Sequence, residues 1–494
     1  MIGIGTLNPS AALVHLQLNE EPMEPIIQLL TLALAFVLLL AFLRRSTKRR
    51  PHRGSIKVRD PTVARTALMD HADAFSNHPV PPFPSGRRVT YSIFSAPYGP
   101  LWRALRCNLT AGILHPSRLG LLAPLHGEAI EALVAGLLAG AGGEMAVRDH
   151  LHSAVFSSVA RMCFGDGVDT RDLGAILHEL QEFFVSFVGV MASRRSWRSR
   201  LLHWRKHRRF AGTRDRLNQL IIPLIVAARR RRPSRRGDGG VRPYVDSLLD
   251  LRVPCDDDDD EEHTRRFLSD EEMATLAWEF LSAGTSGAVA CIEWTLAHLV
   301  AQPAIQKRLH REVAGDQCVS ESRIRGMPYL HAVVLESLRL HPPQSFLIRD
   351  VREEGVAIAG AAVPAGGTRV YFITGDIGRN SEAWRNPEEF QPERFLAGGE
   401  GEGVGLVPGP KEIRMMPFGA GRRYCPGVGL AVMQVKSFVA ELVREFEWAP
   451  PAEGCGVDFT ELGGFFNGMK TPLKARVTPR TPAHGSRAGG RNKK

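Results

Sequence analysis

Cys425 is the residue of this 494-residue chain whose setting best suits chemistry. It lies in the segment FGAGRRYCPG, residues 418–427, and a long amphipathic helix is predicted directly after it. A cysteine just before a helix N-terminus gains thiolate character from the helix dipole and from nearby backbone N–H groups. The glycines of the loop allow the backbone to approach a large flat partner, and Arg422 and Arg423 add positive charge. A free cysteine in a basic loop is the alternative reading.

The loop resembles the haem-binding loop of the cytochromes P-450, whose pattern is F-x-x-G-x-R-x-C-x-G. Every fixed position of that pattern is matched, by Phe418, Gly421, Arg423, Cys425 and Gly427. The resemblance covers roughly residues 58–478. It is greatest to the plant microsomal members, in particular the group numbered 89, which implies a role in plant secondary metabolism.

Three more motifs of that family occur in the family's order. Trp102 and Arg106 in YGPLWRALR match the W-x-x-x-R of the family's helix C. Glu336 and Arg339 form E-x-x-R within LESLRLHPP, and residues at i and i+3 share one helix face and can pair. Arg394 in FQPERF would complete a structural Glu–Arg–Arg cluster, because planar guanidinium groups suit a partly buried network.

The resemblance implies a haem-thiolate monooxygenase that oxidises a small lipophilic molecule with O2. Electrons would come from NADPH through a membrane-bound NADPH–cytochrome P-450 reductase. The Cys425 thiolate would be the axial ligand of the iron of haem b (iron protoporphyrin IX) and would push electron density towards O–O cleavage. Arg423, Trp102 and Arg106 would hold the haem propionates.

Other residues are candidates through the same resemblance. Arg349 is a weaker candidate for a propionate ligand than Arg423. The family's basic residue falls one position later, where this chain has Asp350. The basic residues near Cys425 in sequence are expected to meet an acidic reductase face: Lys411, Arg414, Arg422 and Lys436. Four aromatic residues are candidates for the substrate pocket, with an ordinary place in the core as the alternative: Phe184, Phe187, Phe280 and Phe346.

The predicted central helix departs from the family at the oxygen-activating residues. The family usually carries A-G-x-(D/E)-T-(T/S), whose acid and alcohol relay protons during oxygen activation. Residues 283–288 read AGTSGA, so Ser286 stands in place of the acid and Gly287 in place of the threonine. Gly284 is expected to leave room for oxygen, and Thr285, Ser286 or the substrate to order a water that replaces the relay.

Three functions follow from this departure. The first is slow or unconventional monooxygenation, because general acid–base help is worth about 10²–10⁴-fold and its loss does not silence every reaction. The second is a haem-thiolate isomerase or dehydratase that takes no electrons, which the lost acid–alcohol pair favours. The third is an inactive or truncated family member.

Residues 26–43 form an apolar run with one polar side chain, Gln28, and no charge. At about 1.5 Å per residue the run spans about 27 Å, which suits the thin endoplasmic reticulum bilayer. Glutamates precede the run and basic residues follow it, so the positive-inside rule places residues 1–25 in the lumen and the catalytic domain in the cytosol. A single-pass anchor in contact with membrane lipid is predicted rather than a cleaved signal peptide, because no small-residue cleavage site follows.

The remaining chain is predicted to be a basic linker at 44–57, a haem-thiolate catalytic domain at 58–478 and a basic disordered tail at 479–494. Periodicity predicts mostly helices, including a long one that begins after Ser269, and short strands at 356–374. The expected fold is mainly α with a small β region, the cytochrome P-450 fold. The family's hinge, first helix and first two strands have no counterpart after the anchor, so the N-terminal part of the main sheet is expected to be missing. A misjoined gene model or a splice variant would explain this.

Composition excludes several other classes of protein. The formal charge is +11, but the excess sits in separate basic segments without interleaved aromatic residues, so no nucleic-acid partner is expected. The seven cysteines are scattered and include no C-x-x-C pair, which argues against a disulfide scaffold, a structural zinc module and a c-type cytochrome.

Overall fold

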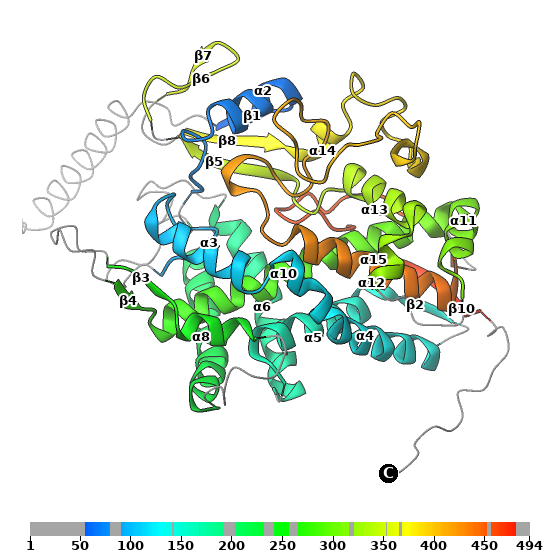
Figure 1. Cartoon of the computed structure of the whole chain (residues 1–494), viewed down its shortest axis with the longest axis horizontal. Coiled ribbons are helices and arrows are strands. Elements are labelled where there is room, and N and C mark those ends of the chain that lie inside the picture. The colour runs from blue at the N-terminus through cyan, green and yellow to red at the C-terminus, as the bar shows by residue number, and fades with distance from the viewer. Residues whose placement is uncertain are drawn as a thin grey trace, which may run out of the picture. The chain divides into compact units, whose positions relative to one another are not determined.

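The fold is described from a computed structural model of the chain (Figure 1). The described residues are 55–79, 90–140, 143–166, 168–191, 203–231, 242–255, 265–315, 321–351, 353–364, 368–451 and 456–480. Residues 54–494 form one compact unit. The predicted lumenal segment at 1–25 and the anchor at 26–43 lie outside the described residues.

Helices make up most of the described chain, as expected for a mainly α fold. The longer helices are α3 (Pro100–Gly112), α4 (Pro116–Ala139), α5 (Val147–Phe164), α6 (Thr170–Met191), α8 (Trp204–Arg231), α10 (Asp270–Ala301), α11 (Pro303–Val313), α13 (Pro328–Leu340) and α15 (Val428–Glu445). The short helical segments are α2 (Pro61–Arg65), η1 (Thr66–Asp70), α9 (Tyr244–Leu249), α12 (Glu321–Arg325), α14 (Thr374–Gly378), η2 (Pro392–Phe395) and η3 (Gly421–Arg423).

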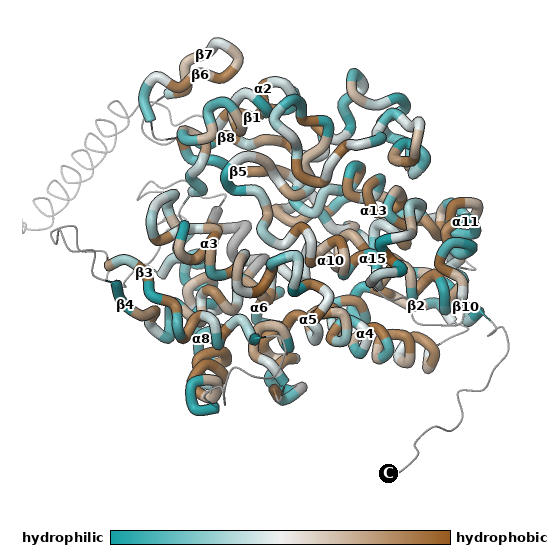
Figure 2. Tube along the Cα trace, viewed as in Figure 1, coloured by the Kyte–Doolittle hydropathy of each residue, from teal (hydrophilic) through white to brown (hydrophobic). Residues whose placement is uncertain are grey.

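Helix α10 is the centre of the helical part (Figure 1). It begins with a capping box, in which Ser269 Oγ accepts the Glu272 N–H and Glu272 Oε2 accepts the Ser269 N–H. The helix is apolar on most sides and packs against α5, α8, α13 and α15. Figure 2 shows the hydrophobic character of α10 and α4 along most of their lengths. The predicted long helix after Ser269 is therefore confirmed.

One described helix, α4, is long and apolar enough to cross a membrane by length and composition, and α10 with α11 passes that test as a bent pair. Both are packed into the protein: α4 contacts α5 and α15, and α10 is largely buried. These helices therefore serve as core elements of the unit.

The main sheet corrects two expectations about the N-terminal boundary. Strand β1 (Ser55–Val58) pairs in parallel with β8 (Thr368–Ile373), and β8 pairs antiparallel with β5 (Phe346–Val351). The predicted linker at 44–57 is therefore too long, and the expectation that the first strands are missing is wrong for β1. The physical reason is that Val58 is buried in the core beside the sheet, so this short strand is held by apolar packing as well as by the ladder.

The other strands form small sheets at the edges of the helical part. Strands β2 (Glu144–Ala146), β10 (Lys474–Pro479) and β9 (Phe446–Ala449) form one sheet, β3 (Arg252–Pro254) pairs with β4 (Arg265–Phe267), and β6 (Ala357–Ile358) pairs with β7 (Ala361–Ala362). The strands predicted at 356–374 are confirmed by β6, β7 and β8. The tail predicted from 479 begins too early, because Pro479 pairs with Phe446 and Arg480 donates to the Phe446 carbonyl.

The Cys425 loop lies between two hydrophobic cores. The larger core is formed by the helices, and Phe418 packs against it. The smaller core is formed by the main sheet with α2 and η1, and it includes Ala420. The loop therefore depends on the correct placement of the sheet against the helices.

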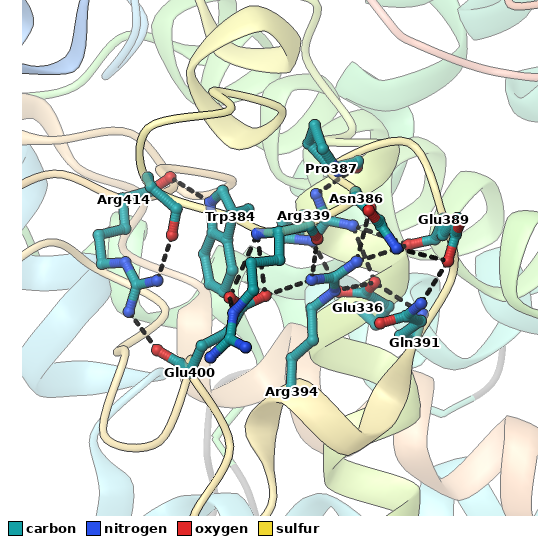
Figure 3. Close-up of polar contacts among 12 residues, drawn as sticks. Glu336, Arg339, Trp384, Asn386, Pro387, Glu389, Gln391, Arg394, Glu400 and Arg414 are labelled. Carbon is teal, nitrogen blue, oxygen red and sulfur yellow. Dashed lines mark hydrogen bonds and ion pairs between the residues drawn. The ribbon is translucent and has the colours of Figure 1, made fainter.

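A buried carboxylate, Glu336 on α13, holds two arginines in place (Figure 3). Glu336 Oε2 accepts Arg339 Nε at 2.7 Å, and Oε1 accepts Arg339 Nη2 at 2.8 Å and Arg394 Nε at 3.2 Å. The side chains of Glu336 and Arg339 are fully buried, and that of Arg394 is 3% exposed. The Gln391 N–H also donates to Oε1 at 2.8 Å. The three residues are thus one network, as the spacing predicted.

The two arginines also bind backbone carbonyls of the irregular segment at 378–400. Arg339 Nη1 donates to the carbonyls of Gly378 and Pro387, and Arg394 Nη2 donates to that of Asn386. The network continues to Glu400, which accepts Arg394 Nη1. This segment has little regular secondary structure, so side-chain donors take the place of a backbone ladder.

The histidine pair between α10 and α13 is a second buried polar contact. His341 Nδ1 lies 3.0 Å from Glu461 Oε1, so Nδ1 carries a proton and the His341 Nε2 of a neutral ring is an acceptor. His298 Nε2 lies 3.0 Å from His341 Nε2 and is then the donor. Burial lowers the pKa of both histidines. Burial opposes ionisation of Glu461, but His341 and Arg379 outweigh it and lower that pKa to about 2.

We expect Glu336→Gln to lower the free energy of unfolding by about 3–5 kcal/mol, because it leaves buried guanidinium groups without their carboxylate. Thermal unfolding followed by circular dichroism measures the change. Glu382→Gln, at an exposed position in the same segment, is the control and should shift stability by less than about 0.5 kcal/mol. Equal effects of the two substitutions would contradict the role given to the network.

We expect stability to fall as the pH drops below about 6.5, the ordinary histidine pKa, because the unfolded state then binds protons that the buried His298 and His341 do not. Each buried histidine contributes up to about 1.4 kcal/mol per pH unit. His298→Gln keeps a donor for His341 and should make the loss of Tm between about pH 7 and pH 5.5 shallower. His150→Gln, on the exposed side of α5, should leave the wild-type slope unchanged.

Candidate functional site

Cys425 lies three residues before Val428, the first residue of α15, as the sequence predicted for the start of this helix. Its N–H donates to the Phe418 carbonyl at 2.8 Å, and the Gly427 N–H donates to Sγ at 3.3 Å. Loss of solvent raises the pKa of the thiol, while the Gly427 N–H and Arg106 act in the opposite direction. Burial outweighs these two contacts, so the net effect is a raised pKa of the Cys425 thiol.

Gly421 allows the loop to lie directly against η1. Its φ is +71°, and a Cβ at this position would lie 2.3 Å from the Leu68 carbonyl oxygen. Any other residue would be strained by the backbone conformation and would collide with the backbone of η1. Glycine at this motif position is therefore explained by packing between loop and core.

Two buried arginines and a histidine lie together beside the loop. Arg423 donates to the carbonyls of Ser76, Ile93 and Ala96 at 2.7, 2.9 and 2.5 Å. Arg349 is 2% exposed and its Nη1 donates to His78 Nε2 at 2.7 Å. The His78 Nδ1–H then donates to the Phe94 carbonyl at 2.8 Å, so His78 is neutral.

The pKa directions agree with this crowding of positive charge. Burial lowers the pKa of His78 well below its ordinary value, and Arg349 and Arg423 lower it further. Burial and Arg423 lower the pKa of Arg349 to about 9. Among the described residues neither arginine forms an ion pair with a carboxylate. A group that brings negative charge to this place would remove the repulsion.

Trp102 and Arg106 on α3 border the same region. Arg423 Cζ lies 4.8 Å from the Trp102 ring centroid, and Arg106 Cζ lies 4.9 Å from that of Tyr424. Within the described part of the chain, the buried atoms Trp102 Nε1 and Arg349 Nε have no hydrogen-bond partner. These two donors, beside cations that have no carboxylate partner among the described residues, fit the propionates of a haem whose iron Cys425 would hold. Arg349 thus lies close to Arg423, which is an expected propionate ligand, whereas the adjacent Asp350 donates its N–H to the Asn77 carbonyl.

The residues of α10 at the missing relay have separate roles. Thr285 is buried, and its hydroxyl donates to the Leu281 carbonyl at 2.7 Å. A Cβ on Gly284 would lie 2.9 Å from Val159 Cγ1, so Gly284 allows close packing of α10 on α5. Its expected role in leaving room for oxygen stays a prediction. A Cβ on Gly287 would lie 3.7 Å from Pro343, which is ordinary contact. Ser286 is half-buried on the same helix.

A cavity with a mostly apolar wall lies along α10, and Ala283 is part of it. Its lining residues are Thr90, Ser92, Phe94, Ser95, Phe183, Phe210, Arg214, Thr275, Trp278, Glu279, Ser282, Ala283, Gln344, Phe465 and Phe466. Two of the aromatic residues expected in the pocket are placed elsewhere: Phe280 packs on Tyr244, and Phe346 packs on Tyr371 and Phe465. The side chains of Phe184 and Phe187 lie outside the described residues.

The expected basic docking surface is corrected at Lys436. Its ammonium is buried and donates to the Ile324 carbonyl at 3.1 Å, because α15 packs against α12. Arg414 is half-buried and lies 4.2 Å above the Trp384 ring (Figure 3). Lys411 and Arg422 are exposed, and Arg422 pairs with Asp73 at 2.7 Å.

Two residues of the site, His78 and Glu279, were not found from the sequence. His78 is far from Cys425 in the chain, and a lone histidine before a proline has no local signal for this role. Glu279 Oε2 accepts the Ile93 N–H at 2.8 Å and Oε1 accepts the Phe94 N–H at 2.7 Å. Glu279 thus holds the turn whose carbonyl oxygens bind Arg423 and His78.

Comparison with known proteins agrees with this geometry. The family model described as Cytochrome P450 matches residues 48–476. Cytochrome P450 89A9 of Arabidopsis thaliana is 35% identical over 444 residues, which cover 86% of this chain and 84% of that protein. Trimethyltridecatetraene synthase of Zea mays is 32% identical over 446 residues, which cover 85% and 79%.

A solved structure of a zebrafish cytochrome P450 with progesterone superposes with a TM-score of 0.68. It is 22% identical, and the match covers 86% of this chain and 93% of that chain, so it shows the shared fold alone. The family match includes the Cys425 loop, the Glu336 network and α3. The expected resemblance to plant relatives is confirmed, and the chain belongs to the cytochrome P450 family.

Proposed function

We propose that the chain is a membrane-anchored haem-thiolate monooxygenase that acts on a small lipophilic molecule. The observation that carries the proposal is Cys425 just before α15, beside two buried arginines that form no ion pair with a carboxylate in the described part of the chain. Bound haem would supply oxygen activation. One oxygen atom of O2 enters a C–H bond of the substrate and the other becomes water, with two electrons and two protons taken from NADPH and solvent.

Each residue of the site then has a definite task. Cys425 Sγ holds the iron, and Gly421 lets the loop pack close to η1 so that the sulfur is well placed. Arg349, Arg423 and Trp102 Nε1 hold the propionates, and Arg106 adds positive charge at the edge. The cavity wall along α10 excludes water from an apolar substrate.

Proton delivery is the weak step of this site. The Thr285 hydroxyl donates to its own helix, position 286 carries no acid and position 287 carries no hydroxyl. We therefore propose poorly coupled turnover, in which much of the NADPH is spent without product. The same departure favours a second candidate function, a haem-thiolate isomerase or dehydratase, which would turn over without NADPH.

The location and electron donor are proposed from the sequence and the plant relatives. Residues 26–43 would anchor the chain in the endoplasmic reticulum membrane, where an NADPH–cytochrome P-450 reductase supplies electrons to the cytosolic domain. Lys411 and Arg422 are the exposed members of the basic set near Cys425. The presence of β1 in the main sheet weighs against the inactive or truncated alternative.

We expect the reduced wild-type protein, expressed in membranes, to give a red-shifted Soret band with carbon monoxide, because Cys425 would supply a thiolate ligand to the iron. Cys425→Ala should abolish that band. Cys255→Ala, at a half-buried cysteine outside the loop, is the matched control and should keep it. A wild-type protein that binds no haem, or shows only the shorter-wavelength band of a lost thiolate, would end the proposal.

We expect the double substitution Ser286→Asp with Gly287→Thr to lower the hydrogen peroxide released per NADPH oxidised by about tenfold or more, because it restores an acid–alcohol pair. A Cβ at position 287 would make only an ordinary contact with Pro343. Gly287→Ala adds the Cβ without a hydroxyl and should change nothing. An unchanged peroxide yield in the double variant, with haem content intact, would show that the relay is not the limiting defect.

A further inference from the structure

The apolar wall of the cavity along α10 is almost entirely aromatic. Six of its fifteen lining residues are phenylalanine or tryptophan, whereas Phe, Trp and Tyr together make up 7% of the chain. The other apolar lining residue is Ala283, and none of the described lining residues is Leu, Ile, Val or Met. Aliphatic side chains would exclude water equally well, so the choice of rings is informative about the molecule that the cavity holds.

Three of the rings come from three neighbouring helices. The centroid of the Phe183 ring on α6 lies 5.1 Å from that of Phe210 on α8 and 4.5 Å from that of Trp278 on α10. Helix α8 packs against both α6 and α10. Regular secondary structure therefore fixes this part of the wall as one contiguous aromatic surface.

The other three rings come from two irregular segments. The Phe465 centroid lies 6.0 Å from that of Phe94 and 5.1 Å from that of Phe466, and both pairs are nearly perpendicular, at 87° and 86°. Phe94 is held in place because its N–H donates to Glu279 Oε1. Perpendicular neighbours present both ring faces and ring edges, which are the two surfaces that a further aromatic ring can contact.

The wall also contains a hydrogen-bond donor that the protein does not use. Trp278 lines the cavity, and its Nε1–H is buried without a hydrogen-bond partner among the described residues. A buried donor is costly when no acceptor meets it. An acceptor atom on the bound molecule would satisfy it.

The charged side chains of the wall are engaged by the protein. Both oxygens of the Glu279 carboxylate accept backbone N–H groups, from Ile93 and Phe94. Arg214 also takes part in an interaction within the chain. The wall therefore does not require a charged partner, and a neutral molecule avoids the cost of burying a charge.

We propose that the substrate is a neutral, flat aromatic molecule with a hydrogen-bond acceptor, such as an ether or carbonyl oxygen. The acceptor binds Trp278 Nε1–H, and the ring system lies among the six aromatic side chains of the wall. The proposal rests on the proposed function and names the substrate class of that same site.

Contact between rings gives a preference over aliphatic molecules of the same size. An aromatic ring has a negative face and a positive edge, so a bound ring gains from offset-stacked and edge-to-face contacts that a saturated ring cannot make. A rigid, flat molecule also loses less conformational freedom on binding than a flexible chain does. The ring contacts correspond to about threefold to tenfold in affinity.

The test uses the full-length, haem-loaded chain in lipid nanodiscs and three neutral probes of similar size. 2-Methoxynaphthalene has both aromatic rings and an acceptor oxygen, 2-ethylnaphthalene lacks the oxygen, and 2-methoxydecahydronaphthalene lacks the aromatic rings. Equilibrium dialysis measures binding, and dialysis against empty nanodiscs corrects for partition into lipid. After this correction, we expect the wild type to bind 2-methoxynaphthalene about threefold to tenfold more tightly than either of the other probes.

Two variants remove one ring each and keep an apolar side chain, Phe183→Leu and Phe465→Leu. Each should reduce the preference for 2-methoxynaphthalene over the saturated probe by about twofold or more. Neither should change the preference over 2-ethylnaphthalene, because both of those probes are aromatic. Phe459→Leu is the matched control, since Phe459 lies in the same segment as Phe465 but packs on His298 and does not line the cavity.

Trp278→Phe keeps a ring and removes the donor. It should abolish the preference for 2-methoxynaphthalene over 2-ethylnaphthalene and keep the preference over the saturated probe. Trp204→Phe, at an exposed tryptophan on α8, is the control and should change neither preference.

Equal corrected affinities of the wild type for the aromatic and saturated methoxy probes would overturn the aromatic class. Equal affinities for 2-methoxynaphthalene and 2-ethylnaphthalene would overturn the role given to Trp278, and so would equal effects of Trp278→Phe and Trp204→Phe. The carbon monoxide spectrum of each preparation separates these failures from failure of the proposed function, because a thiolate band without the expected preferences removes the substrate class alone. If Phe183→Leu gives no band, the variant at the half-buried Phe465 decides the outcome.

Discussion

The buried carboxylate of Glu336 is the constraint on which the placement of the site depends. It is fully buried and has Arg339 and Arg394 as partners, so each of the three charges would be costly without the others. The two arginines in turn bind carbonyl oxygens of the irregular segment at 378–400. That segment leads to Arg414 and then to Cys425. The position of the Cys425 loop therefore depends on the Glu336 ion-pair network rather than on regular secondary structure.

A second constraint is the excess of buried positive charge beside the loop. Arg349 and Arg423 repel each other and lower the pKa of His78 between them. The turn held by Glu279 supplies only neutral carbonyl oxygens to these groups. An anionic cofactor relieves the repulsion, so cofactor binding and the stability of this region are coupled.

The departures on α10 have different physical consequences. Gly284 allows the contact between α10 and α5 at Val159. This packing alone explains a glycine at position 284, whether or not the position also leaves room for oxygen. Position 287 borders Pro343 with room for a Cβ, so the absence of a side chain there is not imposed by a clash at that atom. Helix α10 keeps its packing although its relay has been lost, which is consistent with a fold that tolerates changes in its chemistry.

The sequence alone determined the features that have local signals: the Cys425 loop before α15, the pairing of Glu336 with Arg339, and the capped start of α10. Contacts between distant segments were decided only by the tertiary structure. His78 meets Arg349, Lys436 is buried under α12, and β1 joins β8 across the chain. Spacing and periodicity report on one turn or one strand, whereas burial and charge depend on which segments are brought together.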